Sequence, residues 1–194
     1  SADGALAQLR RLIGERPDGV ERARELLQVA AAPLPINGRP LAAGVAALDV
    51  PDDDLAAVWH LGDFVREYRG DCHNAAWVAA GLTATDIGIL TELSWGMPLR
   101  SYSRTRGWTS DEFDRSEHHL RDLGHLDGTG ADTHLSQPGR HAREEIEVAT
   151  DDQMRPALDA LGDDIHELLD ILSPWGEAIR AGCGYLGAGP HDRG

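Results

Sequence analysis

Residues 109–140 read TSDEFDRSEHHLRDLGHLDGTGADTHLSQPGR, and this stretch decides the fold. Its first part is an amphipathic run that follows a Thr-Ser pair and stops at Gly124, so the sequence predicts a helix over residues 111–123. Short apolar stretches on either side of a glycine-rich tip predict a small hairpin over residues 125–135. Ser136 can then cap a further helix. The stretch therefore predicts a helix, a two-stranded hairpin and a second helix in succession.

Helical patterns also precede this stretch. Pro51 and the aspartates after it form a favourable helix start, which predicts a long central helix over residues 52–80. Thr83 and Asp86 have the spacing of a capping box and predict another helix, and a short helix is predicted over residues 98–105. Three helices, a two-stranded wing and a further helix make a winged helix-turn-helix. The predicted fold class is mainly α, with a helical lobe beside this winged domain.

The domain organisation follows from these elements. Apolar residues occupy most of the circumference of the central helix, so we expect it to be largely buried. Four segments are predicted: a helical lobe over residues 1–80 that ends in the central helix, a winged-helix domain over 81–150, C-terminal helices over 151–182, and a flexible tail over 183–194.

The charge of the chain argues against nucleic acid as a partner. Its 18 basic residues oppose 33 acidic residues, a net charge of −15 that repels nucleic acids and anionic membranes. Between Ser110 and Leu123, five acidic residues oppose only Arg115 and Arg121. A helix that grips DNA normally presents several bases to the phosphates. We therefore expect neither nucleic-acid binding nor membrane binding.

Other functional classes are excluded by missing patterns. No apolar run approaches the roughly 18 residues of a membrane span, and the chain starts without a basic-then-apolar leader, so we expect a cytoplasmic protein. Cys72 and Cys183 lie far apart, which argues against a disulfide framework and a structural zinc site. No phosphate-binding glycine loop or dinucleotide fingerprint occurs, so no cofactor is expected.

A stripe of polar residues on the central helix is the candidate site. The residues near this stripe, at three- and four-residue steps, are Asp63, Arg66, Gly70, His73, Asn74 and Trp77. His73 is predicted to act as base or acid and Asn74 to orient a substrate, with Arg66 and Trp77 as substrate-binding residues. The alternative is that Arg66 forms ordinary ion pairs and that His73 is a core histidine with satisfied hydrogen bonds.

A metal site on the same helix is a weaker alternative. His60, Asp63 and Glu67 are spaced so that they share a helix face. Such sets arise often by chance in acidic helices, so no metal is predicted.

One basic segment stands out in this acidic chain. Arg100 and Arg104 are four residues apart, with hydroxyl residues between them and Arg106 just beyond. Arginine binds phosphate, sulfate and carboxylate groups through paired hydrogen bonds, so Arg100 and Arg104 are predicted to hold an anionic group of the substrate. The alternative is that these arginines pair with acids of the neighbouring helix.

Two resemblances support the fold. Residues 109–126 and 135–140 resemble the recognition helix and the segment after the wing in MarR-type regulators. Over almost the whole chain, RGDCHNAA at residues 69–76, RGWTSDE at 106–112 and REEIEVATD at 143–151 resemble the SalK-like helix-turn-helix family of actinobacteria.

The second resemblance implies a biosynthetic function. Proteins similar to the SalK-like family occur in natural-product biosynthesis and have been linked to aziridine formation, in which an amine displaces an anionic group of the same molecule. His73 and Asn74, with Arg100 or Arg104, are the residues that the resemblance suggests for such a reaction. The alternative function is a MarR-like transcriptional regulator that responds to a ligand.

A protein partner is also expected. SalK-like proteins usually carry a further helical region before the point where this sequence begins, and that region would cover the apolar central helix. We therefore expect a complex with a smaller protein that replaces it, with a homodimer as the alternative.

Overall fold

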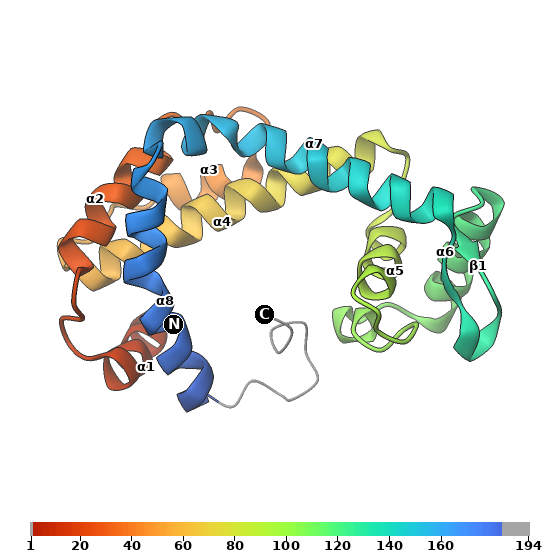
Figure 1. Cartoon of the computed structure of the whole chain (residues 1–194), viewed down its shortest axis with the longest axis horizontal. Coiled ribbons are helices and arrows are strands. Elements are labelled where there is room, and N and C mark those ends of the chain that lie inside the picture. Colours follow the sequence, from red (N-terminus) through yellow and green to blue (C-terminus); the bar gives the residue numbers. More distant parts are fainter. Residues whose placement is uncertain (1, 184–194) are drawn as a thin grey trace. The chain divides into compact units, whose positions relative to one another are not determined.

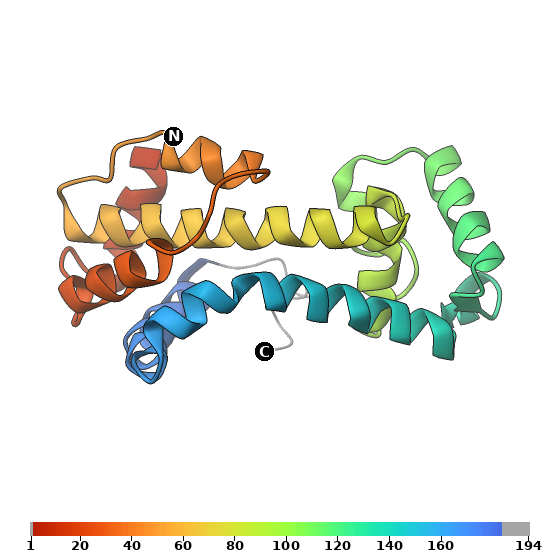
Figure 2. The ribbon, with the colours of Figure 1, turned by 90° about the horizontal axis from the view of Figure 1, so that it is seen from above.

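The structure is a computed structural model that describes residues 2–183. Within these residues the chain forms two compact units. The helical unit consists of residues 2–72 and 152–183, and the winged unit of residues 73–151. Two long helices, α4 (Asp54–Ala79) and α7 (Gln137–Leu161), each pass from one unit into the other (Figures 1 and 2).

The helical unit packs helices around the first part of α4. Its other members are α1 (Ala2–Ile13), α2 (Val20–Ala31), α3 (Pro40–Ala46), the end of α7 and α8 (Asp164–Cys183). Helix α8 contacts both α1 and α2, although it lies at the other end of the described chain (Figure 1). The core contains Leu26, Phe64 and Leu168, and burial of such side chains supplies most of the stabilisation.

The winged unit contains the helix-turn-helix. Its elements in chain order are the end of α4, α5 (Ala84–Ser94), the 3-10 helix η1 (Ser103–Arg106), α6 (Ser110–Asp122), strand β1 (Leu126–Asp127), the 3-10 helix η2 (Gly130–Asp132), strand β2 (His134–Leu135) and the start of α7. Strand β1 pairs antiparallel with β2, with Leu126 opposite Leu135. Ile89, Leu90 and Leu120 are fully buried in its core. The predicted class, mainly α with a two-stranded wing, is confirmed.

Capping boxes begin both helices of the helix-turn-helix. The Asp86 carboxylate accepts a hydrogen bond from the backbone N–H of Thr83 at 2.8 Å, and the Thr83 hydroxyl accepts one from the N–H of Asp86 at 3.2 Å. Thr109 and Glu112 form the same arrangement at the start of α6. Reciprocal bonds of this kind satisfy N–H groups that the first turn of a helix leaves open. The capping box predicted at Thr83 is confirmed.

The segment over residues 98–105 differs from the prediction. Only residues 103–106 are helical there, as η1, and Arg100 has a left-handed backbone with φ 60°. The cause is Glu92 of α5, a fully buried carboxylate that accepts backbone N–H bonds from Arg100, Tyr102 and Ser103 at 2.5, 3.1 and 2.8 Å. These bonds replace those that a helix would make within itself.

Several boundaries also differ. The α7 helix runs through the predicted break between residues 150 and 151, and α8 extends to Cys183, which the sequence placed in the tail. Residues 184–194 of that predicted tail lie outside the described residues. Helix α4 is buried along much of its length, but Trp59 and Val78 are exposed, so the expectation of burial on all sides is wrong at these positions. None of the described helices has the length and apolar character needed to cross a membrane.

Candidate functional site

Three of the predicted site residues of α4, His73, Asn74 and Trp77, line a pocket of about 270 Å³ in the winged unit. The last turns of α4 form one wall, α5 forms a second, and the segment between α5 and α6 closes the site. This His73 pocket is lined by His73, Asn74, Trp77, Ala84, Ile87, Gly88, Thr91, Trp95, Tyr102, Ser103, Arg106 and Trp108.

The hydrogen bonds around His73 define its tautomer. Its Nδ1 lies 3.2 Å from the hydroxyl oxygen of Thr150, and that hydroxyl donates to the carbonyl of Ile146 at 2.7 Å. With the Thr150 hydroxyl hydrogen directed at the Ile146 carbonyl, Thr150 accepts a hydrogen bond from Nδ1–H of His73. In neutral His73 the lone pair that can accept a proton is therefore on Nε2.

A carboxylate lies near the same ring nitrogen. An oxygen of Glu147 is 3.8 Å from Nδ1 of His73, and Arg143 pairs with that oxygen at 2.6 Å. The Arg143 guanidinium therefore offsets much of the negative charge that Glu147 presents to the ring. Thr150 and Glu147 thus both lie on the Nδ1 side of the His73 ring.

Asn74 and Trp77 are joined one helical turn apart. The indole N–H of Trp77 donates to the side-chain carbonyl oxygen of Asn74 at 3.1 Å. This bond fixes the orientation of the amide, whose NH₂ group is then the part that can donate to a bound molecule.

Arg106 supplies positive charge to the pocket. Its guanidinium carbon lies 5.7 Å from the centre of the Tyr102 ring, a cation–π distance. The Tyr102 ring in turn packs against Trp95, with ring centres 5.8 Å apart. Among the ion pairs found within residues 2–183, none uses Arg106, so its charge is available to an anionic ligand.

Arg100 is occupied elsewhere. Its guanidinium pairs with Asp114 at 2.5 Å and with Glu117 at 2.8 Å, and it lies over the Phe113 ring. The pairing with acids of the neighbouring helix, left open by the sequence, is therefore the observed state of Arg100. It connects the segment after α5 to α6 and does not line the His73 pocket.

The other two predicted arginines also lie away from this pocket. Arg104 is exposed on η1 and is not among the lining residues. Arg66 belongs to the helical unit, where it pairs with Asp63 at 2.7 Å and with Glu67 at 2.5 Å. His60, Asp63 and Glu67, the alternative metal ligands, do not form a metal site. Within the described residues no group of three His, Cys, Asp or Glu side chains is placed to hold a metal ion.

Sequence reasoning missed residues that support the site. Glu92 had a signal, since a glutamate within the apolar run of α5 predicts a buried carboxylate with backbone partners. Thr150 had no signal in the sequence, because its contact with His73 joins residues that are 77 positions apart in the chain.

The α6 helix, which corresponds to the recognition helix of a helix-turn-helix, has an acidic exposed surface. Arg121 donates to the carbonyl of Gly128 at 2.8 Å and to the Thr133 hydroxyl at 3.2 Å, so it ties α6 to the wing. Arg115 remains as the exposed base of the helix. The exposed acids around it are Asp111 and Asp122, together with Asp114, which pairs with Arg100.

Comparison with known proteins adds the family. A family model described as a helix-turn-helix family matches residues 1–186, which extends over both units. Comparison with curated proteins and with solved structures finds no match to this chain.

Proposed function

The chain belongs to a helix-turn-helix family, and from this premise we propose that it binds a small molecule. We also propose that it does not bind DNA, although it has the winged helix-turn-helix fold. A fold of this kind does not fix function, so the proposal depends on the site. The observation that carries it is the convergence of His73, Asn74 and Trp77 with Arg106 around one pocket. These side chains offer a base, an amide donor, an aromatic wall and a cation.

We further propose that the bound molecule carries an amine next to a carbon with an anionic leaving group, such as sulfate or phosphate. The amine nitrogen attacks that carbon, the N–C bond forms as the C–O bond breaks, and the electron pair leaves with the anion. The proton lost by the nitrogen passes to Nε2 of His73, and Arg106 stabilises the departing anion.

This finer proposal rests on the resemblance to SalK-like proteins and to aziridine-forming complexes. The pocket supports it because ring closure within one molecule needs chiefly orientation, a base and an anion clamp. No cofactor takes part in this scheme.

The test uses 2-aminoethyl hydrogen sulfate as the probe, because it carries an amine and a sulfate on neighbouring carbons. We expect calorimetric binding to the parent, and a loss of about tenfold or more in His73→Gln and Arg106→Gln, since a charge-assisted hydrogen bond contributes about 1.5–3 kcal/mol. Asn74→Ala should weaken binding less. Arg104→Gln is the matched control, an exposed arginine of the same 3-10 helix, and should bind as the parent does.

Melting temperatures separate a binding role from a structural one. His73→Gln and Asn74→Ala should melt close to the parent. The proposal is wrong if the parent does not bind the probe, if Arg106→Gln binds it unchanged, or if both α4 variants melt several degrees lower.

The regulator alternative has a direct test. Because the exposed surface of α6 is acidic, we expect no salt-sensitive binding of the chain to a mixed-sequence DNA duplex at low salt, measured by fluorescence polarisation. Submicromolar binding that weakens with added salt would favour a regulator instead.

A further inference from the structure

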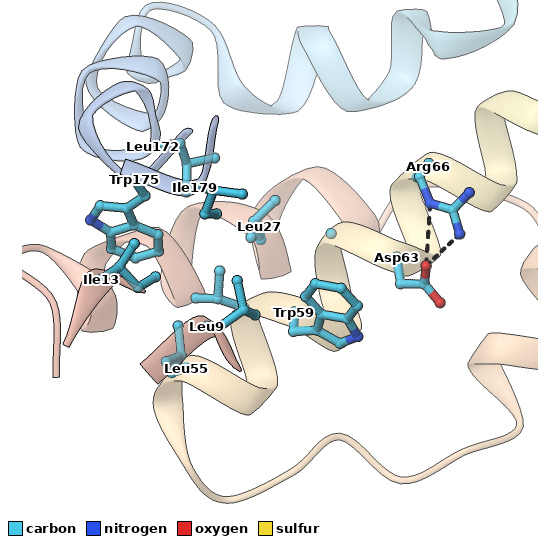
Figure 3. A pocket seen from close by; sticks show the side chains of 12 residues that line it. Leu9, Ile13, Leu27, Leu55, Trp59, Asp63, Arg66, Leu172, Trp175 and Ile179 are labelled. Carbon is cyan, nitrogen blue, oxygen red and sulfur yellow. Dashed lines mark hydrogen bonds and ion pairs between the residues drawn. The ribbon is translucent and has the colours of Figure 1, made fainter. Parts of the chain in front are cut away.

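The helical unit contains a second pocket, of about 330 Å³. Its walls come from α1, α2, α4 and α8, and nearly all the lining side chains are aliphatic or aromatic (Figure 3). Trp59 and Trp175 form part of these walls, and Asp63 and Arg66 are its only charged residues. This Trp59 pocket is separate from the His73 pocket, since the two share no residue.

The volume is too large for a packing defect. The pocket is open to solvent beside Trp59, and it is far larger than the small voids that a packed interior leaves. Small-molecule sites span about 300–1,000 Å³ and are mostly apolar with a few polar groups. The Trp59 pocket has the size and the lining of such a site.

Gly62 keeps one wall of this pocket open. A glycine in the interior of a helix costs about 1 kcal/mol relative to alanine. This cost has no packing reason, because a Cβ at Gly62 would meet no atom within 4 Å. At Gly70 of the same helix a Cβ would instead contact Leu41. The space beside Gly62 is therefore room that a bound molecule can use.

The polar end of the pocket is the ion pair of Asp63 with Arg66, and Glu67 lies just outside the lining residues. Arg66 donates twice to the same oxygen of Asp63, at 2.7 and 3.3 Å, and once to Glu67. One guanidinium thus faces two carboxylates, and the second oxygen of Asp63 keeps its lone pairs for another donor. Figure 3 draws this ion pair at the end of the pocket, beside Trp59.

We propose that the Trp59 pocket binds a compact hydrophobic amine. The apolar body lies between the aliphatic walls and the two indoles, and the ammonium group donates to Asp63. An aromatic ring beside a carboxylate, as Trp59 lies beside Asp63, favours a cation over a neutral or anionic group. The proposal is independent of the proposed function, because none of these residues lines the His73 pocket.

Three probes with one ring system and different charge test it: 1-naphthylmethylamine, 1-naphthylmethanol and 1-naphthoate. In calorimetric titrations of the full chain, the amine should bind about tenfold more tightly than the alcohol, and the carboxylate most weakly. Asp63→Asn should bring the amine and the alcohol to similar affinity. The matched control is Asp170→Asn, an exposed acid of α8, which should leave the preference unchanged.

Gly62→Leu tests the place of binding. It should abolish binding of all three probes without lowering the melting temperature, because leucine favours the helix and its Cβ has room. His73→Gln should leave this binding unchanged, which separates the test from that of the proposed function.

Three results would overturn the proposal. They are no binding of any probe to the parent, equal binding of all three, and unchanged binding in Gly62→Leu. A dimer of the parent that Gly62→Leu converts to a monomer would also overturn it, since a second copy would then occupy the pocket.

Discussion

At the scale of single residues, the hydrogen-bonding surroundings of each histidine decide what it can do. Nδ1 of His73 has the Thr150 hydroxyl within hydrogen-bond distance and a carboxylate oxygen of Glu147 at 3.8 Å. His125, at the start of the wing, has the opposite surroundings. Its Nδ1 is buried and has no hydrogen-bond partner among the described residues.

The His125 ring predicts a pH dependence of stability. Burial lowers the pKa of His125 below its ordinary value of 6.5, and the nearby His119 lowers it further. As the pH falls below about 6.5, the unfolded chain takes up a proton at this position that the folded chain does not. The free energy of unfolding should therefore decrease as the pH falls through this range.

His125→Gln should remove this contribution. We expect the fall in melting temperature between about pH 7.5 and pH 5.5 to be smaller in the variant than in the parent. The matched control is His118→Gln, an exposed histidine of α6, which should keep the pH dependence of the parent. An equal fall in the parent and in His125→Gln would contradict the prediction.

At the scale of elements, one carboxylate of α5 organises the segment that carries Tyr102 and Arg106. Glu92 is fully buried and holds three backbone N–H groups between residues 100 and 103. These bonds place the segment across α5, where Ser103 and Arg106 reach the His73 pocket.

Glu92→Gln should destabilise the winged unit. The amide NH₂ group cannot accept a hydrogen bond, so at least one buried backbone N–H loses its partner, at a cost of about 1–3 kcal/mol. Urea unfolding should report this loss, and the backbone amides of residues 100–103 should exchange hydrogen faster. Glu144→Gln, on the exposed surface of α7, is the control. Unchanged exchange at these amides would show that Glu92 does not hold the segment.

At the scale of the whole molecule, both units leave large apolar side chains at the surface. Trp59 of the helical unit is 45% exposed and Val78 of the winged unit 58%, both on α4, and Leu169 of α8 is 54% exposed. Exposed apolar residues are common one at a time, so the expectation of a partner rests on the resemblance to SalK-like proteins.

We propose that the chain forms a stable complex with a smaller protein, with a homodimer as the alternative. Obligate interfaces commonly bury about 2,000 Å² or more, so either complex should persist on dilution. Light scattering of the chain alone and with a co-expressed neighbour is the measurement. A monodisperse monomer of 20.9 kDa that gains no stability from the neighbour would contradict both forms.

The local part of this fold could be predicted from the sequence by itself. The capping box at Thr83, the helix that ends before Gly124 and the hairpin of the wing depend on contacts between residues close in the chain. Such contacts leave patterns of spacing that can be recognised. The grouping of His73, Asn74 and Trp77 on one wall has the same origin, because helical periodicity alone places them together.

Only the tertiary structure decided which arginine reaches the site and where the second pocket lies. Spacing favoured Arg100 and Arg104 as one helix face, but Glu92 holds their segment in another conformation, and Arg106 lines the pocket instead. The Trp59 pocket combines α1 with α8, from opposite ends of the described chain. Local propensity carries no information about such contacts, because they form only when apolar surfaces from distant parts of the chain pack together and are removed from water.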